Sequence, residues 1–154
     1  METSENEILL QVFSSVFEEF AFMFVEEDGD DPYDDKGLCP CLLAEIGFTG
    51  SDKKGVMEVA APAEICDELA ENILGLEQQE LPEGAGENAL TEVLNVACGY
   101  FLAEKYGTDE VFDLSIPETS EVSDEQWAEM ASEGRYIRLL VDESPFMAKF
   151  AVRQ

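Results

Sequence analysis

Histidine is absent from this chain of 154 residues, and basic residues are scarce, with 8 Lys and Arg against 36 Asp and Glu. Without histidine, Ser-His and Cys-His nucleophilic mechanisms and histidine-ligated metal sites are excluded. A formal net charge of −28 also lacks the clustered cations that neutralise nucleic-acid phosphates or anionic lipids. The composition therefore predicts a protein that binds neither nucleic acid nor a membrane.

Long hydrophobic runs are also missing. The most apolar stretch, residues 20–25, is far shorter than the roughly 20 residues that span a bilayer. The sequence begins Met-Glu-Thr-Ser-Glu, without a cationic leader, so we expect a cytoplasmic protein. Hydrophobic residues nevertheless make up 45% of the chain, which is enough for one core. Length and composition together predict a single domain over residues 1–154.

The acidic excess has two interpretations. It can be a solvated surface, or an adaptation to a salty cytoplasm in which ions screen the self-repulsion. It can also steer a basic partner toward the protein.

Cysteine occurs at only four positions, Cys39, Cys41, Cys66 and Cys98, which do not form a dense disulfide framework. The two thiols of the Cys-Pro-Cys sequence could join the other two in a four-Cys zinc site. Cys66 and Cys98, however, lie among apolar neighbours in predicted helices, where a free thiol behaves as a small hydrophobe. The sequence therefore favours ordinary thiols and no metal site.

Apolar residues recur at helical spacing in three segments, residues 4–24, 63–74 and 87–106. In the first segment Ser4 is a candidate N-cap, with Glu7 three residues later as its capping-box partner. A further short helix is predicted over residues 124–131.

Strand-like alternation marks five segments, and four of them make two hairpins: residues 42–49, 56–60, 111–116, 136–142 and 146–152. Two polar stretches separate the elements, an acidic loop at residues 26–37 and a linker at residues 77–86. The acidic loop fails as an EF-hand because Tyr33 occupies the position that needs glycine. The pattern predicts an α+β fold, with an antiparallel or mixed sheet of about five strands covered by two or three long helices.

The helix predicted over residues 87–106 is apolar around most of its circumference, which implies burial on several sides. With about 100° per residue, the remaining positions Asn88, Glu92, Asn95 and Gly99 fall on one narrow stripe. Gly99 costs about 1 kcal/mol of helix stability relative to Ala. We therefore expect another backbone or helix to approach it closely, within the fold or from a docked molecule.

The sequence Asn88-Ala-Leu-Thr-Glu92-Val-Leu-Asn95-Val-Ala-Cys-Gly99 resembles the active-site helix of the CheC/CheX/FliY chemotaxis phosphatases. That family carries Asp or Ser, then Glu four residues on, Asn three further, and a proline about two dozen residues later. Here Asn88 stands at the first position and Pro117 near the last. The order of elements between residues 8 and 152 is also similar, and the single intact motif is most like CheX.

The resemblance implies a CheC/CheX-like fold and a phosphatase that hydrolyses the aspartyl phosphate of a CheY-like response regulator. Asn95 would orient the attacking water, and Glu92 would pair with the regulator's lysine; these are the two candidate catalytic residues. Asn88 and Gly99 would contact the partner. The protein would need no cofactor of its own, since Mg²⁺ is expected on the regulator, and it would be a homodimer.

A second interpretation is a non-catalytic binding or adaptor module of the same fold in chemotaxis or flagellar-switch signalling. Asn88 departs from the Asp or Ser of the family. The first helix offers Ser14 and Glu18 as a second copy of the motif but has Ala21 where the asparagine would be. Binding of a phosphorylated regulator without turnover would distinguish this module from an enzyme.

Overall fold

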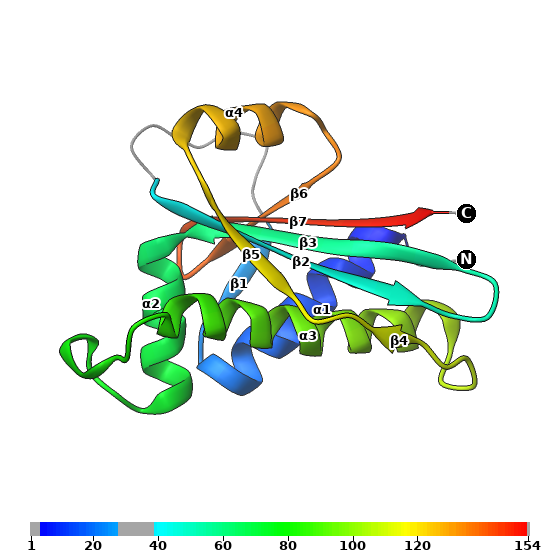
Figure 1. The fold of residues 1–154 in the computed structure, drawn as a ribbon, viewed down its shortest axis with the longest axis horizontal. Helices are drawn as coiled ribbons and strands as arrows, with labels where there is room; N and C mark the ends of the chain where they lie inside the picture. The colour runs from blue at the N-terminus through cyan, green and yellow to red at the C-terminus, as the bar shows by residue number, and fades with distance from the viewer. Residues whose placement is uncertain (1–3, 28–38, 154) are drawn as a thin grey trace.

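The computed structural model describes residues 4–27 and 39–153, which form an antiparallel sheet with helices on both faces (Figure 1). In chain order the elements are α1 (Glu5–Ala21), β1 (Val25–Glu27), β2 (Cys41–Thr49), β3 (Lys54–Pro62), α2 (Ala63–Leu74), the 3₁₀ helix η1 (Gln78–Glu80), α3 (Ala85–Tyr106), β4 (Asp113–Leu114), β5 (Glu118–Val122), α4 (Asp124–Ser132), β6 (Ile137–Val141) and β7 (Ser144–Arg153). The α+β class expected from the sequence is confirmed.

Within residues 4–27 and 39–153 the sheet has seven strands in the order β1-β6-β7-β3-β2-β4, and β5 pairs with β2 as well. Both predicted hairpins, β2–β3 and β6–β7, are present. The second turn was expected at residues 143–145, between its two predicted strands. In the structure it lies at Asp142 and Glu143, which adopt positive φ angles of 46° and 70°. Such angles at both central residues suit a two-residue hairpin turn.

The first helix ends earlier than its apolar pattern suggests. Ser4 caps it as predicted, its Oγ accepting a hydrogen bond of 3.2 Å from the Glu7 N–H. The helix stops at Ala21, because Phe22 adopts a left-handed conformation with φ of 55°. Residues 22–24 therefore lead into β1 instead of continuing the helix.

The other helices agree closely with their predictions. Helix α2 has the expected bounds, and α4 covers the expected segment of residues 124–131 with one further residue. Helix α3 begins at Ala85, so it includes the last residues of the linker expected at 77–86, and η1 occupies part of the rest.

The estimate of about five strands was too low, because β1 and β5 carry no alternating hydrophobic pattern. Only Val122 is buried in β5, and only Val25 in β1. The acidic loop expected at residues 26–37 begins with two residues of β1, and the rest of it lies outside the described residues. Of the strand expected at residues 111–116, only Asp113 and Leu114 pair with β2.

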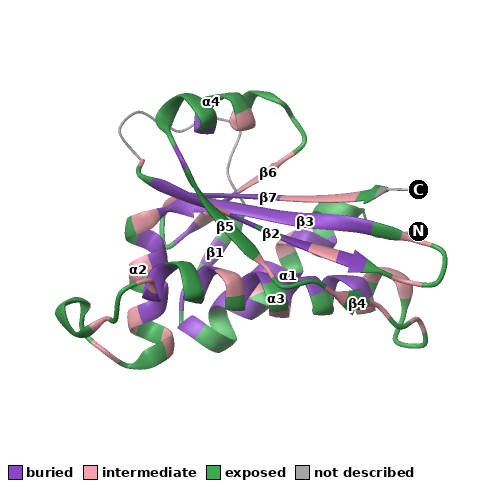
Figure 2. Cartoon of the chain, viewed as in Figure 1, coloured by how far each residue is buried: buried purple, intermediate pink, exposed green. Residues whose placement is uncertain are grey.

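The main core lies between the sheet and the layer formed by α1, α2 and α3 (Figure 2). The aromatic stripe of α1 belongs to it, since the rings of Phe13 and Phe17 lie 5.3 Å and 5.2 Å from the ring of Phe146 in β7. A smaller cluster on the opposite face packs Trp127 of α4 against Cys41, Val122 and other residues. Helix α4 thus covers one end of the second face (Figure 1).

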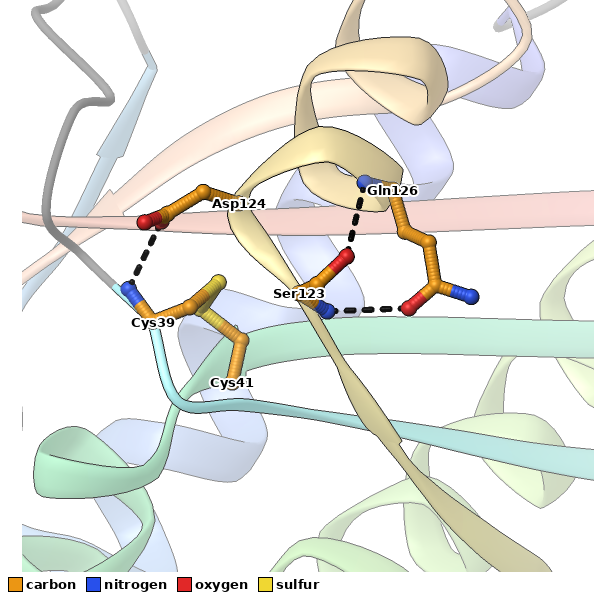
Figure 3. The surroundings of a disulfide bond; sticks show 5 residues. All are labelled: Cys39, Cys41, Ser123, Asp124 and Gln126. Atoms are coloured by element: carbon orange, nitrogen blue, oxygen red, sulfur yellow. Dashed lines mark hydrogen bonds between the residues drawn. A yellow bond between two sulfur atoms is a disulfide. The ribbon is translucent and has the colours of Figure 1, made fainter.

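The cysteines divide between these two clusters. Cys39 and Cys41 form a disulfide beside the start of α4, where the Cys39 N–H donates to Asp124 Oδ1 at 3.1 Å (Figure 3). This pairing corrects the expectation of ordinary thiols at these two positions. Cys66 and Cys98 are free and buried in the main core. The four sulfurs are therefore not gathered, and residues 4–27 and 39–153 hold no group of three or more His, Cys, Asp or Glu placed to bind a metal.

The two buried thiols predict a loss of stability at alkaline pH. Burial raises the pKa of Cys66 and of Cys98 from 9.0 to about 12. Above pH 9 the thiols ionise in the unfolded chain but stay protonated in the folded one, so rising pH favours unfolding until about pH 12. Between pH 8 and pH 10 we expect urea denaturation to show a decrease of about 2–3 kcal/mol in the free energy of unfolding from these groups.

A variant with both Cys66→Ala and Cys98→Ala is the control for this prediction. Between pH 8 and pH 10 its free energy of unfolding should fall by about 2–3 kcal/mol less than that of the wild type. An identical pH dependence in both proteins would show that the thiols are not responsible.

Candidate functional site

Helix α3 lies across the helical layer and is covered on several sides, as its sequence predicts. It contacts α1, α2, β2, β3 and β5, and the Lys105 ammonium near its end lies 3.1 Å from the Glu5 carboxylate of α1. Its buried residues form the sides that face these elements: Ala85, Gly86, Ala89, Leu90, Val93, Leu94, Ala97, Cys98, Phe101 and Leu102.

The stripe predicted from the helical spacing is open to solvent. Asn88, Glu92, Asn95 and Gly99 are all exposed, whereas the positions beside them, such as Val93, are buried. Residues three and four apart share one face of a helix, so the Glu92 carboxylate and the Asn95 amide are neighbours. The structure thus brings all four predicted site residues to one accessible surface.

Within residues 4–27 and 39–153, no hydrogen bond or ion pair occupies the side chains of Glu92 and Asn95. The polar contacts nearby are made by the backbone of Asn88, whose N–H donates to the Gly84 carbonyl at 3.0 Å and whose carbonyl accepts from Thr91 Oγ1 at 2.9 Å. A carboxylate and an amide therefore remain available to a docking molecule.

The close approach of another backbone or helix expected at Gly99 is not found among the described residues. In the described ranges, no atom outside the glycine's chain neighbours and its own helix backbone lies within 4 Å of the position that a Cβ would occupy, so no other backbone or helix there approaches it closely. The space above this residue is open, and the folded chain does not explain the cost of a glycine in the helix.

The proline of the family pattern lies on a segment that runs beside α3. The connection from β4 to β5, which contains Pro117, passes along the helix (Figure 1), and α3 contacts β5. Ser115 holds this connection on β2, because its N–H donates to the Gly47 carbonyl at 2.9 Å and its Oγ accepts from the Gly47 N–H at 2.8 Å.

The incomplete second motif lies on α1. Ser14 is half-buried and Glu18 is exposed, but Ala21 is fully buried in the main core. The position of the missing asparagine thus faces the interior, so α1 offers no second exposed Glu and Asn pair.

None of the helices in the described ranges is long and apolar enough to cross a membrane.

Fold and site together define a class of α+β protein in which three helices back an antiparallel sheet and one helix presents Glu and Asn to solvent. The family described as chemotaxis phosphatase CheX matches residues 42–138, which is more than half of the chain. The chain therefore belongs to the CheX family.

Solved structures with this fold share little sequence with the chain. CheX from Desulfovibrio desulfuricans is 16% identical, with a TM-score of 0.67 over 97% of this chain and 99% of that one. A CheX from Borrelia burgdorferi, solved as a complex with CheY, BeF₃ and Mg²⁺, is 18% identical, with a TM-score of 0.66 over 99% and 100%. FliY from Thermotoga maritima is 10% identical, with a TM-score of 0.54 over 96% and 90%. No curated protein matches the chain in sequence.

Proposed function

We propose that this chain hydrolyses the aspartyl phosphate of a CheY-like response regulator. The observation that carries the proposal is the exposure of Glu92 and Asn95, side by side on a helix that is otherwise packed into the fold. Membership of the CheX family supports it, as does the complex that the Borrelia burgdorferi relative forms with CheY.

Asn95 suits the task of orienting water. Its carbonyl oxygen can accept a hydrogen bond from the water, while its NH₂ group donates toward the phosphoryl oxygens. Hydrolysis of a phosphoryl group requires an in-line water and stabilisation of charge more than it requires a protein nucleophile. Water attacks phosphorus, the bond to the aspartyl oxygen breaks, and inorganic phosphate and a free carboxylate result.

Glu92 is assigned a docking role. One turn before Asn95, its free carboxylate can pair with a lysine of the regulator and thereby fix the helix beside the phosphoryl group. The Mg²⁺ that neutralises the phosphoryl oxygens belongs, in this proposal, to the regulator. The chain supplies position and hydrogen bonds, a contribution that can amount to several kcal/mol of the barrier.

The test of the function is the rate at which a phosphorylated CheY-like regulator loses phosphate with and without this protein. Acceleration that saturates with regulator concentration supports the proposal. An unchanged rate for every CheY-like regulator of the same genome contradicts it.

Glu92→Gln is expected to raise KM for the phosphorylated regulator about tenfold while kcat changes little, because an interaction used equally for binding and reaction affects KM alone. Steady-state phosphate release measures both constants. Glu104→Gln is the matched control, since it removes an exposed carboxylate from the same helix outside the stripe. An unchanged KM for Glu92→Gln would refute the docking role.

The second candidate function is a binding module without catalysis. Two observations favour it: Asn88 replaces the family's Asp or Ser, and α1 lacks a second motif. A regulator that binds tightly yet keeps its phosphate would establish this alternative.

The homodimer implied by the resemblance stays a prediction, to be measured by light scattering.

A further inference from the structure

The polar stripe of α3 runs into a hollow at its C-terminal end. A cavity of about 240 Å³ lies between this half of the helix and the segment of residues 107–114. Gly99 and Leu102 line it from the helix, and Phe112 and Leu114 line it from the segment that follows. The hollow thus begins one helical turn after Asn95.

The hollow suits an apolar group. Among the described residues Glu110 is the only charged one that lines it, and its carboxylate lies 3.0 Å from the ammonium of Lys53, which also pairs with Asp52 at 3.1 Å. The Phe112 wall is held by ring contacts with Phe48 at 5.7 Å and with Tyr106 at 5.6 Å. An acid that is already paired and a firmly packed aromatic wall favour an apolar side chain over an ion.

Exposed apolar side chains occur next to the lining residues in the sequence. Tyr100, which follows Gly99, is 43% exposed, while Val111 and Ile116, which flank the strand residues of β4, are 79% and 87% exposed. Each is within two positions of a lining residue in the chain. Exposed apolar area next to the hollow favours an interaction there.

We propose that this hollow binds an apolar side chain that the response regulator carries beside its phosphorylation site. The inference rests on the proposed function. Gly99 lies about 6 Å along the helix from Asn95. A typical protein interface buries about 800 Å² of each partner, so a regulator that brings its phosphoryl group to Asn95 also covers Gly99.

This assignment explains why position 99 is a glycine. A side chain at this position would project into the open space at the hollow and obstruct the incoming group, whereas hydrogen leaves the way free. The glycine thus favours docking at the expense of helix propensity. It is a specificity-determining position and not a catalytic residue.

The test compares Gly99→Leu with the wild type in binding to a CheY-like regulator activated with beryllofluoride. Leu has a higher helix propensity than Gly, and its Cβ has no neighbour within 4 Å, so the variant should melt at the same or a higher temperature. We expect Kd to rise at least about tenfold, equivalent to about 1.4 kcal/mol.

Ile116→Ser tests the same surface from an exposed loop, and it should raise Kd several-fold. Phe22→Ser is its matched control, because Phe22 is similarly exposed, at 83%, but lies at the end of α1. Kd should not change for this control. Equal Kd values for Gly99→Leu, Ile116→Ser and the wild type would overturn the inference.

The binding measurement separates this inference from the catalytic proposal. If Gly99→Leu weakens binding but the wild type does not accelerate phosphate loss, the hollow is a docking site and the catalytic assignment is wrong. If the wild type accelerates phosphate loss and Gly99→Leu binds normally, only the hollow is refuted. If the wild type binds no CheY-like regulator of its genome, both are refuted.

Discussion

Asn95→Ala is expected to lower the rate of stimulated dephosphorylation at saturating regulator by at least about 100-fold. Removal of one positioned hydrogen-bonding group from an active site typically costs a factor of 10²–10³ in kcat. The Asn95 side chain is exposed and makes no bond within the described residues, so it has no part in holding the fold together. Its loss should therefore affect the chemical step and leave the helix intact.

Phosphate release from the regulator measures this effect, and thermal melting confirms the fold. Asn6→Ala provides the control, because Asn6 is another exposed asparagine in a helix, on α1. Its rate should equal that of the wild type. If Asn95→Ala kept the full rate, Asn95 would not orient the attacking water, even if the stripe on α3 binds the regulator.

Trp127→Ala is expected to reduce the free energy of unfolding by about 3–5 kcal/mol, the usual cost of truncating a large buried aromatic residue. Trp127 is 0% exposed and is the largest side chain of the cluster between α4 and the sheet. That cluster contains few other buried residues, so the surroundings have little material with which to refill the cavity.

Urea denaturation followed by circular dichroism measures the change, since the variant has no tryptophan for fluorescence. Phe24→Ala is the control, because Phe24 is 68% exposed and its truncation should change stability by no more than about 0.5 kcal/mol. A loss below about 1 kcal/mol for Trp127→Ala would show that α4 is not anchored by this residue.

Trp127→Ala should keep its activity while it is folded. Helix α4 lies on the opposite side of the sheet from α3 (Figure 1). At a temperature where the variant is folded, its kcat should therefore remain close to that of the wild type.

The helices could be predicted well because their signals are local. Helix α2 has the bounds that its apolar spacing predicted, and Gly75 ends it in a left-handed conformation. The stripe on α3 follows from the angular spacing of Asn88, Glu92 and Asn95 alone. These features depend on residues within a few positions of one another.

The strands that were not predicted, β1 and β5, form through pairing with distant segments and not from a local sequence pattern. Strand β5 is built from mostly exposed polar residues and exists because Val122 pairs with Cys41, 81 positions earlier in the chain. The Cys39–Cys41 disulfide likewise lies against α4, which is distant in sequence. Neither arrangement leaves a periodic pattern that could be recognised in advance.

By itself, the amino-acid sequence determined the α+β class, the three long helices and the identity of the polar stripe, since helical periodicity and end signals act over a single turn. Only the tertiary structure decided that the stripe faces solvent, that Gly99 borders open space and that a hollow follows it. The physical reason is that exposure and cavities are set by how distant segments pack. The segment of residues 107–114, folded back beside α3, makes the hollow that no spacing of residues along the helix could reveal.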